Sequence, residues 1–203
     1  MKISVLGFGN VGAQLVRLWS AAGHSLTVGL RSGSKREQEA QELGVSVLDP
    51  QLAVQSADVI ALALPWTAVE ETLRSIGPLP AKILLDATNP LRPDLSVLAP
   101  ASGSGGQQVA EWAPDAHVVK AFNTIGARFY GDPAFDVLYC GENSEAKSVV
   151  GGLIEDTKMR PVDVGPLRCA AHLEHLAALW IDLAVNGRIQ GAFGFNLVTK
   201  SSR

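Results

Sequence analysis

Three glycines near the start of the sequence have the spacing of a backbone site for a diphosphate group. Gly7, Gly9 and Gly12 directly follow the apolar run at residues 3–6 and open a run with helical periodicity. In such a pattern the first glycine permits a tight turn, the second lets a phosphate approach the backbone, and the third lets helix and strand pack closely. The free N–H groups at the start of the helix then favour a negative ligand. The segment therefore predicts a dinucleotide site made by Gly7, Phe8, Gly9, Asn10, Val11 and Gly12.

The segment after the second predicted strand, residues 25–30, should distinguish NAD from NADP. An NAD site places a carboxylate there, about 20 residues beyond the glycine turn, where it binds the ribose hydroxyls. Here no acid occurs between residues 28 and 36. Arg31 can donate two hydrogen bonds to phosphate oxygens, and Ser32 and Lys35 add further donors. We therefore predict that this segment binds the 2′-phosphate of NADP(H); a solvated basic loop is the structural alternative.

Later segments carry a family resemblance. Besides the glycine turn and the Arg31-Ser32 loop, the chain contains Leu-Pro-Trp at residues 64–66, Asp-Ala-Thr-Asn-Pro at 86–90 and Val-Lys-Ala-Phe-Asn-Thr at 119–124. From residue 1 to about residue 195 the chain resembles the NADP oxidoreductases that depend on the deazaflavin coenzyme F420, to which the oxidoreductase domains of six-transmembrane ferric reductases are related. The resemblance implies a Rossmann protein, commonly dimeric, that moves hydride between NADP(H) and a deazaflavin or flavin.

The resemblance also implies roles for loops at the carboxyl edge of the sheet, where ligands bind in this fold. Asn123 and Thr124 would offer polar groups to the nicotinamide carboxamide, although Asn123 is also a typical turn residue. Two stacked redox rings exchange hydride directly, so the protein mainly positions them, and no general acid or base is assigned. At the ribose the resemblance implies Leu64 and Pro65, and in the middle of the cleft it implies Asn89 and Pro90. At the nicotinamide it implies Ala121, Phe122, Asn123 and Thr124.

The elements that must position these residues alternate between short apolar runs and longer helical runs, which predicts parallel strands joined by helical crossovers. We expect an α/β doubly wound Rossmann fold, with a mainly parallel sheet, helices on both faces and a small C-terminal helical extension. Residues 1–203 should form one domain, with the sheet core at about 1–165 and the C-terminal helix and tail at about 166–203. The expected strands are residues 3–6, 25–30, 45–48, 59–64, 82–86, 117–121, 136–140 and 160–164, and the expected helices are 11–22, 35–43 after a Ser34 cap, 67–76, 107–112, 144–156 and 170–186.

The last expected helix, residues 170–186, has an apolar stripe from Leu173 to Gly187 at spacings of three and four. We interpret it as amphipathic, sealing either the fold or a subunit interface. For Trp180, Phe193 and Phe195 we favour packing in a dimer over the alternative, the wall of a flavin pocket.

Two polar signals receive structural interpretations. Lys120 is read as a buried residue in an ion pair, at least as readily as a catalytic base. The His-Leu-Glu-His segment at residues 172–175 lacks the histidine spacing of zinc motifs, so it is read as a polar helix face.

Composition limits the remaining functions. A net charge of −3 offers no basic surface for nucleic acid, and the longest apolar run, residues 59–65, is far shorter than the roughly 20 residues of a membrane span. Cys140 and Cys169 predict neither a disulfide framework nor a zinc site, and the N-terminus lacks the features of a signal peptide. We expect a cytoplasmic homodimer that acts on a small-molecule redox acceptor, without a metal, a nucleic-acid partner or membrane contact.

Three functions are compatible with these signals. The leading one is hydride transfer between NADPH and a deazaflavin such as coenzyme F420. The alternative enzyme is an NADPH-dependent flavin or ferric reductase using FMN or FAD. It stays open because the resemblance specifies the dinucleotide-binding fold better than it specifies the hydride acceptor. The third is a non-catalytic NADP(H)-binding redox sensor, which would bind NADPH without oxidising it.

Overall fold

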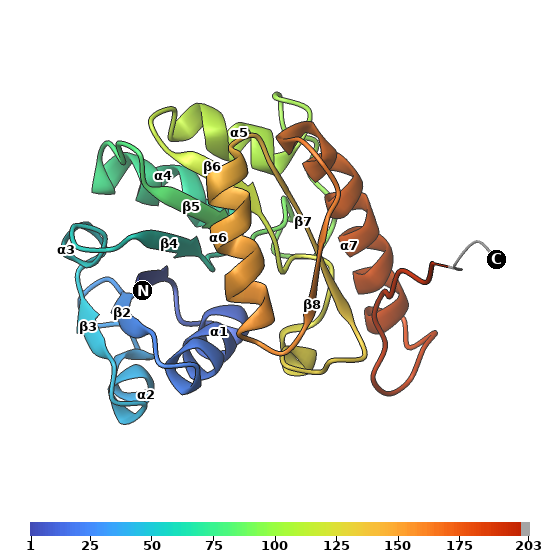
Figure 1. The fold of residues 1–203 in the computed structure, drawn as a ribbon, viewed down its shortest axis with the longest axis horizontal. Helices are drawn as coiled ribbons and strands as arrows, with labels where there is room; N and C mark the ends of the chain where they lie inside the picture. Colours follow the sequence, from blue (N-terminus) through green and yellow to red (C-terminus); the bar gives the residue numbers. More distant parts are fainter. Residues whose placement is uncertain (200–203) are drawn as a thin grey trace.

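The computed structural model describes residues 1–199, in which eight strands form one sheet with helices packed on both faces (Figure 1). The strand order is β3-β2-β1-β4-β5-β6-β7-β8. Its first six positions have the 3-2-1-4-5-6 order of a doubly wound sheet. The predicted fold class is therefore confirmed.

The strands are short and mostly apolar, as expected of strands covered on both faces. All four residues of β4 are buried. The strands are β1 Lys2–Leu6, β2 Ser25–Gly29, β3 Ser46–Leu48, β4 Val59–Leu62, β5 Ile83–Asp86, β6 His117–Lys120, β7 Asp136–Gly141 and β8 Arg160–Asp163. The helices are α1 Asn10–Ala21, α2 Glu37–Glu42, α3 Pro50–Ala53, α4 Trp66–Ile76, α5 Gly105–Trp112, α6 Ser144–Glu155 and α7 Ala170–Val185, with 3-10 turns at Ala127–Phe129 and Leu167–Cys169.

The sheet is parallel except where β6 meets β7, whose pairing is antiparallel. A parallel connection needs a long crossover, which is usually a helix. Between β6 and β7 the chain forms only the 3-10 turn Ala127–Phe129. The chain therefore reverses direction there, at the segment that follows Lys120.

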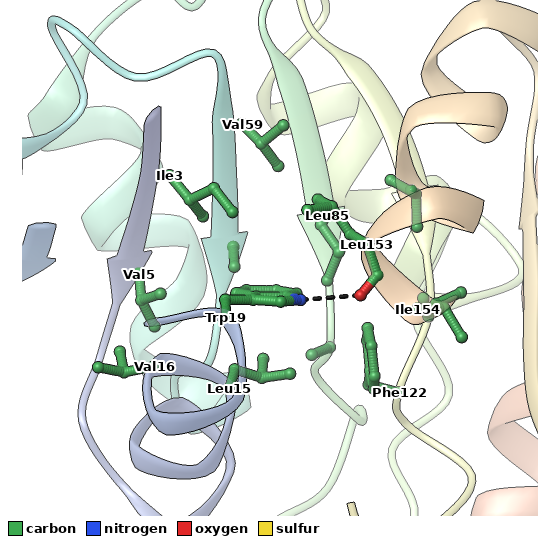
Figure 2. Packing of buried hydrophobic residues seen from close by; sticks show 14 of the residues in the cluster. Ile3, Val5, Leu15, Val16, Trp19, Val59, Leu85, Phe122, Leu153 and Ile154 are labelled. Carbon is green, nitrogen blue, oxygen red and sulfur yellow. Dashed lines mark hydrogen bonds between the residues drawn. The ribbon is translucent and has the colours of Figure 1, made fainter. Parts of the chain in front are cut away.

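Two apolar clusters fill the spaces between the sheet and its helices. One contains residues of α1 and α6, and the other contains residues of α4, α5 and α7. In the first cluster Trp19 is fully buried and donates its indole N–H to the carbonyl oxygen of Leu153 at 2.9 Å, which ties α1 to α6 (Figure 2). The ring of Phe122 lies edge-on to Trp19, with centroids 6.0 Å apart, so the segment after β6 is packed against the same core.

Two helices begin two residues away from the positions that the sequence indicates. Helix α2 begins at Glu37, because Ser34 instead forms a tight turn in which its Oγ accepts a hydrogen bond from Arg36 N–H. Helix α5 begins at Gly105, because Ser104 caps it by accepting from Gln107 N–H. The expected Ser34 cap and the two expected helix starts, residues 35 and 107, were therefore wrong.

The last helix buries one side, as its expected apolar stripe predicts. Helix α7 buries Leu173 and Ala177, whereas His172, His175 and Asp182 on the other side are exposed. Leu179 and Val185, which are 50% and 63% exposed, are the apolar exceptions on that exposed side. Within residues 1–199 no helix is long and apolar enough to cross a membrane.

Candidate functional site

The glycine turn combines close packing with one open position. Gly7 has φ +94°, a conformation that favours glycine, and a Cβ on Gly12 would overlap the carbonyl oxygen of Gly7. A Cβ on Gly9, by contrast, would meet no atom of the described residues within 4 Å. Two glycines thus bring α1 against β1, and the third leaves space beside the start of α1. Phe8, between them, points into the core and is 2% exposed.

Two helix N-termini face a cavity of about 420 Å³. Its wall includes Gly9 and Asn10 at the start of α1, and Pro65 and Trp66 at the start of α4. Within the described chain neither helix start has a side-chain cap, although α3, α5 and α6 are capped by Asp49, Ser104 and Asn143. Free N–H groups at helix starts attract anions, so this cavity suits a diphosphate.

A second cavity, of about 350 Å³, continues from the glycine turn along the end of β2. Gly7, Leu64, Arg31 and Ser32 line it. The guanidinium of Arg31 lies 3.2 Å from the carboxylate of Glu71 on α4. Lys35, also predicted to bind the 2′-phosphate, is exposed to solvent in the turn before α2.

Two asparagines from neighbouring strand ends bind each other at the far side of the cleft. Asn89 Nδ2 donates to the backbone carbonyl of Asn123 at 3.0 Å, and Asn123 Nδ2 donates to Asn89 Oδ1 at 3.1 Å. The backbone carbonyl can only accept, which fixes the orientation of the Asn89 amide and, through it, that of Asn123. Asn123 Oδ1 is then a buried acceptor with no hydrogen-bond donor among residues 1–199. A buried acceptor is costly when unpaired, so the site suits a ligand that carries an N–H donor.

A buried ion cluster lies directly behind this pair. The ammonium of Lys120, which is 0% exposed, lies 2.8 Å from Asp86 Oδ2 and 3.0 Å from Glu174 Oε1. Burial by itself lowers the pKa of Lys120, but the two carboxylates outweigh it and hold that pKa above its usual value. Lys120 is therefore a charged member of an ion cluster, as the structural interpretation predicted, and Glu174 is buried rather than part of a polar helix face.

The backbone between Lys120 and Asn123 is held in an uncommon conformation. Phe122 has φ +64°, which is rare for a residue with a bulky side chain. The hydroxyl of Tyr130 donates to the Phe122 carbonyl, and burial raises the pKa of Tyr130 well above its usual value. A neutral phenol thus stabilises the strained residue that directs Asn123 towards the cleft.

The largest of the described cavities adjoins the asparagine pair and has a volume of about 650 Å³. Asn10, Asn89 and Asn123 form one side of it, and Trp180 and Ile181 of α7 form another. A Cβ on Gly126 would overlap the Trp180 ring, so the loop after β6 lies directly against α7. Trp180 also stacks on Phe193, with centroids 4.9 Å apart, and donates to its carbonyl oxygen at 2.9 Å. Trp180 therefore packs within the chain and also lines a cavity, while its favoured packing in a dimer stays a prediction.

The comparisons with known proteins agree with this geometry. Residues 2–90 match the model of the family described as NADP oxidoreductase coenzyme F420-dependent. The F420-dependent NADP reductase of Methanothermobacter thermautotrophicus is 28% identical over 215 residues, which cover 95% of this chain and 93% of that protein. A solved structure of a putative F420-dependent NADP reductase from Arthrobacter sp. FB24 superposes with a TM-score of 0.88 at 26% identity, covering 98% of this chain and all of that one.

By sequence and by fold, this chain is similar to the coenzyme F420-dependent NADP oxidoreductases. It is also similar to metalloreductase STEAP3 of Rattus norvegicus, with 29% identity over 177 residues. Those residues cover 85% of this chain and 36% of the rat protein. The predicted resemblance is thus confirmed, and a metalloreductase is among the similar proteins.

Apart from Lys35, which is exposed, the predicted site residues fall into two groups in the structure. One group lines the connected cavities and consists of Gly7, Gly9, Asn10, Val11, Arg31, Ser32, Leu64, Pro65, Asn89 and Asn123. The other is buried and consists of Phe8, Gly12, Pro90, Ala121, Phe122 and Thr124. Pro90 packs towards Gly105, and Phe122 packs in the core. The side chains of the second group support the cleft from behind.

Sequence reasoning missed Glu71 and Glu174. Glu174 lies within the His-Leu-Glu-His segment that we read as a polar face. Glu174 contacts glycines at positions 105 and 106, and Glu71 contacts an arginine 40 residues away, so only the folded chain shows either partnership. Within the described residues no group of three or more His, Cys, Asp or Glu could hold a metal ion.

Proposed function

We propose that this chain is an NADP(H)-dependent oxidoreductase that transfers hydride between NADPH and a deazaflavin of the coenzyme F420 type. The observation that carries this proposal is the unpaired Asn123 Oδ1 at the junction between the dinucleotide cleft and the 650 Å³ cavity. An amide at the nicotinamide end of the cofactor would supply the missing donor. Relatives named F420-dependent NADP reductase align with nearly the whole chain, which supports the same acceptor.

The residues of the cleft fit NADP(H) from one end to the other. The backbone N–H groups of α1 would bind the diphosphate next to Gly9, and Arg31 and Ser32 would bind the 2′-phosphate, with Lys35 in reach from solvent. Leu64 and Pro65 would contact the ribose.

The catalytic contribution of the chain is positioning. When bound, NADP(H) supplies or takes up the hydride. Asn89 and Asn123 would fix which ring face is open to the larger cavity, and Trp180 would exclude water from the opposite wall. No side chain is required to move a proton.

A flavin or ferric reductase is the second candidate, and the similarity to metalloreductase STEAP3 over 85% of this chain favours it. The test is to bind NADPH to the purified chain and follow its absorbance with coenzyme F420, FMN, FAD and a ferric chelate. Oxidation with coenzyme F420 supports the first proposal, and oxidation with only flavin or ferric chelate supports the second. Binding without oxidation in any of the four would assign the redox-sensor role.

We further propose that the chain functions as one domain in a cytoplasmic homodimer. The exposed apolar residues Leu179, Val185 and Ile189 at the C-terminal part of α7 and just beyond it support the homodimer. Sedimentation should give twice the chain mass, and Leu179→Glu together with Val185→Glu should reduce it to the monomer mass. A monomeric unmodified chain would refute this assembly.

A further inference from the structure

The ion pair and the asparagine pair join the same two strand ends. Asp86 and Lys120 are direct neighbours in the register of β5 and β6. Each is followed three residues later by an asparagine, and Asn89 and Asn123 bind each other. A change in the spacing of the ion pair must therefore change the position of Asn123.

The ion cluster leaves Lys120 no capacity to bind a ligand. Its three ammonium protons have three acceptors: Asp86 Oδ2, Glu174 Oε1 and, at 2.9 Å, the carbonyl oxygen of Thr88. Asp86 Oδ1 in turn accepts from the Thr88 N–H and hydroxyl, at 2.9 and 2.6 Å. The cluster is buried and complete, so any effect on a ligand must pass through the loops that it holds.

Glu174 extends the cluster to the C-terminal helix. Its carboxylate accepts from Gly105 N–H at 2.8 Å and Gly106 N–H at 2.9 Å, the first residues of α5. A Cβ on Gly106 would come within 2.8 Å of the Ala170 side chain, so the small residues permit this approach. One carboxylate thus fixes α7, α5 and Lys120 together.

We infer that Glu174 and Lys120 are positioning residues that hold Asn123, so that its free Oδ1 accepts a hydrogen bond from the nicotinamide amide. This inference rests on the proposed function. The fixed amide orientation leaves Asn123 Oδ1 without a hydrogen-bond donor among the described residues. Its position is fixed because Glu174 holds Lys120, and Lys120 holds the end of β6 in register with β5.

The test compares NADP⁺ with its 3-acetylpyridine analogue, in which a methyl ketone replaces the amide and no N–H donor exists. Calorimetry on the unmodified chain should show NADP⁺ binding about tenfold more tightly than the analogue, as expected for one hydrogen bond to a buried acceptor. Asn123→Ala should bring the two affinities within about twofold, because the acceptor is gone. Equal affinities in the unmodified chain, or full discrimination in Asn123→Ala, would overturn the contact.

Glu174→Gln tests the positioning role. A glutamine offers one acceptor oxygen where the carboxylate serves three donors, so the cluster loses a contact while the side-chain volume is kept. We expect the ratio of the affinities for NADP⁺ and its 3-acetylpyridine analogue to fall below about threefold. The affinity for 2′,5′-ADP, which has no nicotinamide, should stay unchanged. Glu155→Gln, an exposed substitution on α6, is the matched control and should keep both values. Full discrimination in Glu174→Gln would overturn the positioning role.

A milder variant covers the case in which Glu174→Gln also loses 2′,5′-ADP binding through misfolding. Thr88→Val is nearly isosteric and removes only the hydroxyl that donates to Asp86. It should lower the discrimination and keep 2′,5′-ADP binding, and unchanged discrimination would refute the inference. Failure of the unmodified chain to bind 2′,5′-ADP and NADP⁺ would instead refute the proposed function together with this inference.

Discussion

Arg31 and Glu71 form an ion pair beside the cavity at the end of β2, with Arg31 Nη2 and Glu71 Oε2 3.2 Å apart. Both side chains are largely exposed, at 66% and 74%. The acid comes from α4 and not from the end of β2, where an NAD site would have it. Arg31 is therefore held close to the proposed 2′-phosphate position by a carboxylate that must give way when a phosphate binds.

Replacing Arg31 by alanine should separate the two nicotinamide cofactors. Arg31→Ala should weaken NADPH binding by about 10- to 100-fold, because charge-assisted hydrogen bonds to the 2′-phosphate are lost. NADH binding should change by less than about threefold, because NADH has no such phosphate. Calorimetric titration of both cofactors measures this, and equal losses would refute the assignment of Arg31.

Removing the charge of Glu71 should have the opposite effect on NADPH binding. Glu71→Gln should tighten NADPH binding by up to about fivefold, since an exposed ion pair is worth at most about 1 kcal/mol and no longer competes. The effect should shrink as salt is added, because the charges are exposed. Weaker NADPH binding in this variant would show that Glu71 orients Arg31 productively instead of competing for it.

Gly9 and Gly12 offer a matched pair of substitutions with different expected defects. Gly12→Ala places a Cβ against the backbone carbonyl of Gly7 and should destabilise the fold by about 1–3 kcal/mol or more. Gly9, at φ −77°, can accept alanine, which should cost about 1 kcal/mol or less but occupy the diphosphate space. Denaturant unfolding and NADPH titration distinguish them, and normal NADPH affinity in Gly9→Ala would refute the diphosphate position.

Asp136 should make the attachment of the C-terminal segment depend on pH. It accepts from Arg160 Nε at 2.8 Å and from Leu197 N–H at 2.6 Å, and the Arg160 hydrogen bond holds its pKa below the usual 3.8. A lowered pKa stabilises the fold above about pH 3.8, and this contribution is lost as the pH falls through the lowered value. Asp136→Asn should cost about 1 kcal/mol at pH 7, allowing for the exposure of Arg160.

Urea unfolding at a series of pH values checks this contribution. The difference between Asp136→Asn and the unmodified chain should narrow at the acid end of the series. A difference that stays constant with pH would refute an ionised Asp136 as its source.

The sequence predicts well what is local. The strand–glycine–helix unit from Lys2 to Ala21 is confirmed because spacing and hydrophobic period within about 20 residues determine it. The strand order of the first six strands follows from the alternation of strands and helices.

The contacts that hold the cleft residues in place could not be predicted, because the two residues of each contact are distant in sequence. The Glu174 carboxylate meets α5 across 69 residues, and neither glycine there carries a side chain that would mark the contact. Asn123 was expected at the nicotinamide from the family likeness, but its free oxygen depends on Asn89, 34 residues away. The start of α2 was missed because the Ser34 side chain bonds within its own turn.

Because the starts of α1 and α4 lack side-chain caps, binding of the proposed dinucleotide there should stabilise the fold. An anion bound between them takes the place of two missing caps in the native chain, whereas the unfolded chain offers no such cradle. Such a ligand stabilises the fold by about 2.7 kcal/mol at a free concentration one hundred times its Kd. The protein should therefore resist heat and proteolysis better as the concentration of NADP(H) rises, with a stabilisation that grows with the logarithm of that concentration.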